Sequence, residues 1–138
     1  MLNQSGIKKT TGAAPVQILF NVQNQMSVGI KLAQNFAGAV TENGRKIVKA
    51  GTPLSGDLAA RGTAFVAAAD ESVANAGDAK PAVGILLHDV DVTDAAANAT
   101  LLIWGFVNLD RVDSTTAAKI TAARKTELAG KIWFLKDN

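Results

Sequence analysis

The strongest hydrophobic pattern lies in residues 82–92, which begin continuously apolar and end in strict alternation. At that end one face carries Leu87, Asp89 and Asp91, and the other carries His88, Val90 and Val92. A six-residue polar turn separates this segment from a second apolar run over residues 99–109. The pair predicts a long antiparallel hairpin as the central element of the fold. Gly105, between two aromatic residues, predicts a bulge or a close backbone approach.

Shorter strands are expected before this hairpin. Asn43-Gly44 is a strong hairpin-turn signal, and it precedes a strand over residues 46–50. The segment Gly51-Thr52-Pro53-Leu54 should end that strand, because proline cannot donate a ladder hydrogen bond. Residues 63–68 could form another strand.

The C-terminal quarter changes pattern. Ser114 is a candidate N-cap for a helix over residues 115–129, which Gly130 would terminate. Residues 131–136 then read as a closing strand. The predicted fold class is mainly β (α+β): a small β-barrel or sandwich with a long central hairpin and one C-terminal helix.

The N-terminal end has too little apolar surface to fold alone. We expect residues 1–25 to form a flexible N-terminal arm and residues 26–138 to form a β-rich domain. The apolar run at residues 16–20 could add as a strand to a partner. Neither a signal peptide nor a membrane-spanning run is recognisable, so we expect synthesis as a soluble protein in a cytoplasm.

Amino-acid composition and charge argue against several kinds of functional site. The 138 residues include no cysteine and one histidine, which argues against disulfides, thiolate metal sites and cysteine nucleophiles. The net charge of +2 is unevenly distributed: +5 over residues 1–50, −6 over 51–110 and +3 over 111–138. Such segments favour charge-complementary contacts, although ordinary surface charge explains them equally well. They do not form the basic, aromatic-interleaved patch of a nucleic-acid-binding protein.

The segment from His88 to Asp94 is the most tempting site for a metal or a catalytic base. Its carboxylates lack the glycine and the final glutamate of a calcium loop, and on a strand His88 points away from Asp89 and Asp91. We therefore favour an acidic turn over a metal site, although a metal on a three-fold axis stays open. Without a nucleophile elbow, a phosphate-binding loop or a well-placed base, we expect no catalytic residues, no cofactor and no enzymatic activity. Two converging carboxylates, as in a glycosidase, stay open from sequence alone.

The order of these features resembles that of tailed-phage head fibre and head decoration proteins, including the lambda-type capsid decoration family. The resemblance rests on Gly51-Thr52-Pro53-Leu54, the strand that starts Ala82-Val83-Gly84-Ile85-Leu86, and its return partner. It implies a virion protein on the outside of the capsid, typically a homotrimer, that binds the major capsid protein and neither nucleic acid nor membrane. The longer N-terminal lead and the C-terminal helix depart from the lambda-type pattern, so another mode of attachment and a fibre-like or monomeric arrangement stay open.

The resemblance also assigns candidate contacts. The arm would reach the capsid through Ile7, Lys8, Lys9, Val16, Ile18 and Phe20. Trp104, Phe106 and His88 are candidates for a subunit interface, with core packing as the alternative for the aromatic residues. The expected function is capsid decoration that stabilises the assembled head. The alternatives are a fibre-knob-like module for a receptor or glycan and, with less support, a small hydrolase.

Overall fold

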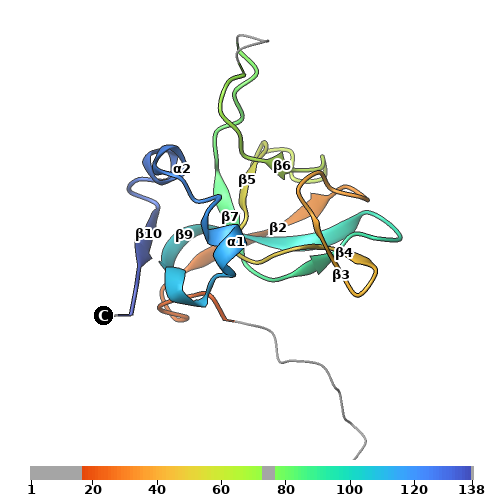
Figure 1. The fold of residues 1–138 in the computed structure, drawn as a ribbon. Helices are drawn as coiled ribbons and strands as arrows, with labels where there is room; N and C mark the ends of the chain where they lie inside the picture. Colours follow the sequence, from red (N-terminus) through yellow and green to blue (C-terminus); the bar gives the residue numbers. More distant parts are fainter. Residues whose placement is uncertain (1–16, 73–76, 138) are drawn as a thin grey trace, which may run out of the picture.

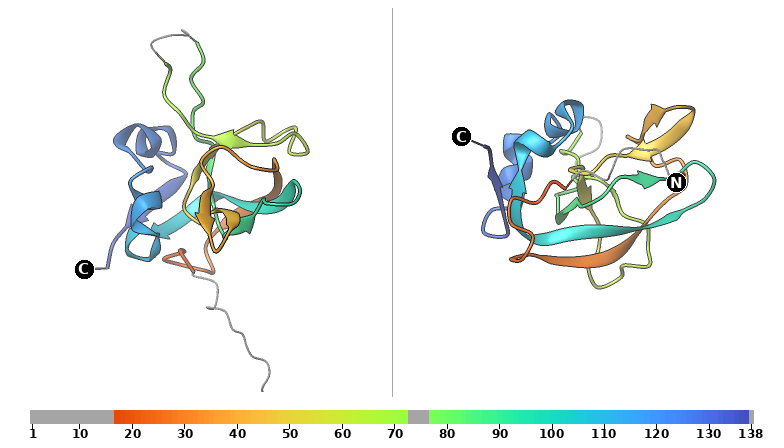
Figure 2. Two further views of the ribbon diagram at one scale, coloured as in Figure 1. Left: turned by 45° about the vertical axis from the view of Figure 1, so that its right-hand side comes forward. Right: turned by 90° about the horizontal axis from the view of Figure 1, so that it is seen from below.

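The longest strand, β9 (Ala97–Asn108), organises the larger of two sheets in the computed structural model, which describes residues 17–72 and 77–137 (Figure 1). Its first half pairs antiparallel with β2 (Met26–Leu32) and with β7 (Gly84–Leu86). Its second half pairs in parallel with β10 (Ile132–Leu135), the predicted closing strand. β2 and β9 lie side by side along their length (Figure 2).

The segment Gly51-Thr52-Pro53-Leu54 was predicted to end the preceding strand, and in the structure it also begins a new one. Pro53 is the first residue of β5 (Pro53–Ser55), which lies between β7 and β6 (Val66–Ala67) in the larger sheet. A first position tolerates the missing N–H of proline, and the Pro53 carbonyl still accepts a hydrogen bond from Ala68 N at 3.1 Å. Leu54 is fully buried, so this segment contributes to the core.

The predicted long hairpin is only partly correct. Ile85 and Leu86 pair with Leu102 and Leu101 of β9, as expected. Beyond Leu87 the chain bends away, and β8 (Val90–Asp91) pairs with β4 (Arg45–Val48) in a second sheet. The bend is fixed because the Asp89 carboxylate accepts a hydrogen bond from Ala50 N at 2.7 Å.

The second sheet has the order β3 (Val40–Glu42), β4, β8. Asn43 and Gly44 join β3 to β4 with φ values of 51° and 77°. Both values are positive, as a type I′ turn requires, so the Asn-Gly prediction is confirmed.

The single helix predicted over residues 115–129 is wrong, because the chain forms two short helices. They are α1 (Ser114–Ala117) and α2 (Ala122–Glu127), and the 3₁₀ turn η2 (Leu109–Arg111) precedes them. Asp113, not Ser114, caps α1, and the Thr121 hydroxyl caps α2 by accepting from Arg124 N. The break buries Ile120 between the helices, and Gly130 follows α2 with a φ of 78°.

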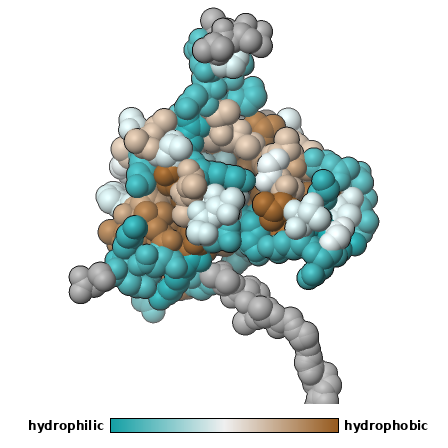
Figure 3. Space-filling view, viewed as in Figure 1, coloured by the Kyte–Doolittle hydropathy of each residue, from teal (hydrophilic) through white to brown (hydrophobic). Residues whose placement is uncertain are grey.

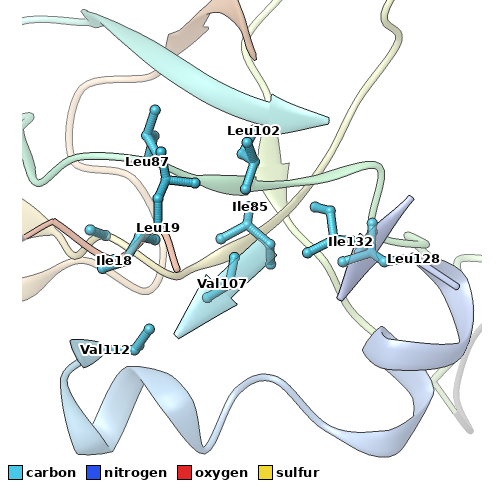
Figure 4. Packing of buried hydrophobic residues seen from close by; sticks show 11 residues of the cluster. Ile18, Leu19, Ile85, Leu87, Leu102, Val107, Val112, Leu128 and Ile132 are labelled. Atoms are coloured by element: carbon cyan, nitrogen blue, oxygen red, sulfur yellow. The ribbon is translucent and has the colours of Figure 1, made fainter. Parts of the chain in front are cut away.

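Two hydrophobic clusters fill the interior. Leu102 and Val107 of β9 contribute to the first, which the helices cover, while Ala99 and Leu101 contribute to the second. Figure 4 shows the first cluster, where side chains from the N-terminal segment, from the sheet and from Leu128, directly after α2, point toward one another. The described residues thus form a mainly β structure of two sheets that do not close into a barrel.

A ribbon leaves the body at Ala69 and returns at Lys80, where the two residues form an antiparallel bridge. The described parts of this projection are mainly hydrophilic (Figure 3). Its base is held by Arg124 of α2, whose guanidinium is almost fully buried and pairs with Asp70 and Glu127. Glu127 also accepts a hydrogen bond from Ala82 N at 2.8 Å, so α2 is tied to both legs of the ribbon.

Candidate interaction surface

Three aromatic side chains cluster on the outward face of β9 and β10. Trp104 contacts Phe106 and Trp133 edge to face, with both pairs of ring centroids 5.9 Å apart. Phe106 stacks on Trp133 at 5.2 Å with an interplanar angle of 25°. Both tryptophans nevertheless keep 40% of their surface exposed. Offset and edge-to-face pairs of this kind hold rings in fixed orientations.

Strand alternation places these rings outside. On β10, Ile132 and Phe134 pack on the first core cluster, so Trp133 and Leu135 must point the opposite way. Trp133 lies directly opposite Phe106 in the parallel register. The outward face of β10 is therefore apolar, and β10 is the terminal strand of the sheet order.

The N-terminal segment extends this surface on the other side of β9. Phe20 N donates to Phe106 O at 2.8 Å, and Met26 lies opposite Trp104. Phe20 and Met26 are exposed, as is Val22 in the loop between them. We call the surface that is formed by Phe20, Met26, Trp104, Phe106, Trp133 and Leu135 the aromatic face. Contiguous exposed apolar patches on soluble proteins mark interaction sites.

A hollow of about 490 Å³ adjoins this face at Trp104. It is lined by Gln23, Asn24, Gln25, Met26 and Trp104. The loop that forms its wall is fixed by Asn21, whose Oδ1 accepts hydrogen bonds from Gln23 N and Asn24 N at 3.0 and 3.2 Å. The loop also packs closely on Gly105, where a Cβ atom would lie 3.2 Å from Gln25 Cβ. The close approach predicted at this glycine is confirmed.

The acidic segment is engaged with cations of the second sheet. Arg45 bonds Asp91 at 2.6 Å and Asp94 at 2.7 Å, and the hydrogen bond from Arg45 lowers the pKa of Asp91 to about 2. Lys49 lies 3.1 Å from both Asp89 and Glu42. Throughout the described ranges, no three His, Cys, Asp or Glu side chains gather as a possible metal site.

The candidate residues named from the sequence separate into groups. Trp104 and Phe106 lie together, as a shared interface requires, whereas His88 is exposed on the bend between β7 and β8 and does not belong to the aromatic face. Phe20 lies on that face. The contacts proposed at Ile7, Lys8, Lys9 and Val16 fall outside the described residues.

Ile18 requires a correction. It is only 1% exposed and belongs to the first core cluster, so it is not free to contact a capsid while the body is folded. Its neighbour Leu19 bridges to Val107 of β9. The apolar run at residues 16–20 was expected to add to a partner, but its described part, residues 17–20, adds to the chain's own sheet.

Sequence reasoning missed Leu135 and Met26 as surface residues and took core packing as the default for Trp133, with a subunit interface as the alternative. A signal existed for β10, because Ile132 and Phe134 alternate with Trp133 and Leu135. Both faces are apolar, however, so alternation alone could not say which face is exposed. Met26 enters the surface through its pairing with Trp104, which is a contact far apart in sequence.

Among the residues that the structure describes, no helix has the length and apolar character needed to cross a bilayer. In comparisons with known proteins, no family model matches the chain and no curated protein matches it significantly. The assignment of a function therefore depends on the surface itself.

Proposed function

We propose that this protein is a non-catalytic binding protein that decorates a phage head and stabilises it by contacts with the major capsid protein and with copies of itself. The observation that carries the proposal is the aromatic face. Its aromatic and methionine side chains are the types enriched at the buried centres of protein interfaces.

The aromatic face lies where the arm joins the body, so the arm and this face could contact the same capsid subunit. Phe20 belongs to the aromatic face, and the chain leading back to residue 1 joins the body only three residues earlier, at Gln17. A segment that orders against the shell would thus begin beside the apolar surface, and both could contact one neighbour. We propose residues 1–16 as the arm, which is shorter than the sequence predicted because residues 17–20 pack on the body.

The acidic segment supports binding in preference to hydrolysis. Asp89, Asp91 and Asp94 each have a structural cation or backbone partner in the second sheet. His88 is exposed at a bend beside them. These groups stabilise the pairing of β4 with β8 and the bend that precedes β8. The aromatic face, in contrast, presents exposed apolar side chains.

Co-sedimentation with mature heads built from the major capsid protein of the same phage tests the proposal. The full chain should sediment with the heads, and a variant lacking residues 1–16 should lose most of that binding. The variant Trp133→Ser/Leu135→Ser should also bind more weakly, because two apolar contacts are removed from the aromatic face.

Val66→Ser is the matched control, because Val66 is equally exposed but lies on β6, at the opposite end of the sheet order. It should sediment like the unmodified protein. Circular dichroism should show that every variant is folded. Unchanged sedimentation of both the shortened chain and the Trp133→Ser/Leu135→Ser variant would refute capsid decoration through these surfaces.

A further inference from the structure

The hollow beside Trp104 differs chemically from the rest of the aromatic face. Its five described lining residues comprise three amides, one thioether and one indole, all of them neutral. A hollow of about 490 Å³ is large enough for a small ligand. An indole and a thioether beside three amides suit a neutral ligand that has both a hydrocarbon face and several hydrogen-bonding groups.

Trp104 provides a supported flat surface. Phe106 and Trp133 contact it with interplanar angles of 74° and 81°, and these contacts restrict rotation of the indole. A pyranose ring has a face of C–H groups that packs on such an indole, because the face of the indole carries partial negative charge and the C–H groups carry partial positive charge. Its hydroxyl groups then point to the sides, where the amides lie.

The amides match hydroxyl groups in number and kind. Each amide offers two N–H donors and a carbonyl acceptor, so it can pair with neighbouring hydroxyls that both donate and accept. The loop carrying Gln23 and Asn24 is preorganised by Asn21 and by its contact with Gly105. Such preorganisation lowers the entropic cost of binding.

Gln25 adds an unpaired polar atom. Its Oε1 is buried and has no hydrogen-bond partner among the described residues. A buried acceptor without a partner is unfavourable. Gln25 also lines the hollow, so the residue that carries this unpaired acceptor is part of the site.

We propose that this hollow binds a neutral saccharide unit, stacked on Trp104 and held by the side-chain amides of Gln23, Asn24 and Gln25. The site goes beyond capsid decoration and does not depend on it. It would let the protein contact a glycan while Trp133 and Leu135, farther along the aromatic face, contact protein.

Tryptophan fluorescence tests the site directly. The chain has two tryptophans, so the variant Trp133→Phe leaves Trp104 as the sole indole reporter. Its emission should be followed against neutral oligosaccharides of glucose, galactose, mannose, rhamnose and N-acetylglucosamine, up to about 10 mM, where weak sites begin to saturate. Saturation-transfer NMR on the unmodified protein provides a second readout.

The paired substitution Gln23→Ala/Asn24→Ala should weaken binding about tenfold through lost hydrogen bonds. Its fold should persist, because the bonds that fix this loop use the backbone N–H groups and Asn21. Trp104→Ala should weaken binding by a similar factor or more. Asn98→Ala is the control, since Asn98 is an exposed amide at the other end of β9, and it should bind like the unmodified protein.

Saturable binding with this pattern of losses supports the site. No saturation with any of the sugars would overturn it, as would equal binding by the amide variant. A preference for anionic over neutral glycans would also overturn it, because the lining is uncharged. If the emission of Trp104 changes with protein concentration and not with sugar, the occupant is a second copy and the saccharide proposal is wrong.

Discussion

At the scale of single residues, two glycines of the larger sheet have opposite surroundings. A Cβ atom on Gly84 of β7 would lie 2.5 Å from the Leu102 carbonyl oxygen, which is backbone and cannot move without disturbing β9. A Cβ atom on Gly29 of β2 would meet nothing within 4 Å. Both glycines belong to strands paired with β9, so they form a matched pair.

Gly84→Ala is therefore expected to lower the free energy of unfolding by about 3 kcal/mol, the cost of overpacking against a rigid neighbour. Gly29→Ala should be neutral or raise it slightly, because alanine reduces the entropy of the unfolded chain. Urea unfolding followed by circular dichroism measures both. Equal destabilisation by the two substitutions would contradict the close approach of β7 to β9.

Arg124 is another residue whose replacement should clearly lower the free energy of unfolding. Its side chain is 4% exposed and pairs with Asp70 and Glu127. Arg124→Ala should lower the free energy of unfolding by about 3 kcal/mol, because it leaves a partly buried carboxylate without its cation. The neighbour Lys125 is exposed, so Lys125→Ala should change stability by less than about 0.5 kcal/mol. Urea unfolding compares the two, and similar effects would show that the Arg124 pairs contribute little.

At the scale of elements, the join between β4 and β8 depends on pH through Arg45. This guanidinium holds the pKa of Asp91 at about 2, below the ordinary aspartate value of 3.8. The folded pKa is the lower one, so the stabilisation is present above pH 4 and is lost as pH falls toward 2. Both side chains are solvent-accessible, so the effect on stability is small and the pKa itself is the better observable.

Carboxyl-carbon NMR titration should give a midpoint for Asp91 of about 2 in the unmodified protein. In Arg45→Gln the midpoint should rise toward 3.8, because the charged hydrogen-bond donor is gone. Stability should also fall less steeply between pH 4 and pH 2 in that variant. A midpoint unchanged by the substitution would assign the low pKa to the neighbouring Thr93.

Local signals predicted some elements and missed others for identifiable reasons. Asn43-Gly44 fixes its turn through backbone preference alone, and the closing strand follows from continuous β-forming residues. The path beyond Leu87 depends on the hydrogen bond that Ala50 N donates to the Asp89 carboxylate, which links residues 39 positions apart. No local pattern contains that contact. The sequence does contain one signal for the break between α1 and α2, because Thr121 is a good N-cap in the middle of the predicted helix.

At the scale of the whole molecule, the aromatic face joins elements from both ends of the chain. Phe20 and Met26 come from the N-terminal part, and Trp133 and Leu135 from the last strand. Sequence alone named Trp104, Phe106 and Phe20 but not Met26 or Leu135, because the surface exists only when β2, β9 and β10 are assembled. The exposed apolar area is thus a property of the fold, and its consequence is expected in solution behaviour.

If copies of the chain associate through this face, as we propose, light scattering after size-exclusion chromatography should give three times the chain mass of 14.3 kDa. Trp133→Ser/Leu135→Ser should weaken association at least about tenfold, because aromatic residues at interface centres dominate binding energy. Val66→Ser, on β6, should leave the mass unchanged. A trimer mass in all three proteins would place the subunit contact elsewhere. If the unmodified protein has the mass of a single chain at every concentration tested, copies do not associate in solution and the prediction of self-association is wrong.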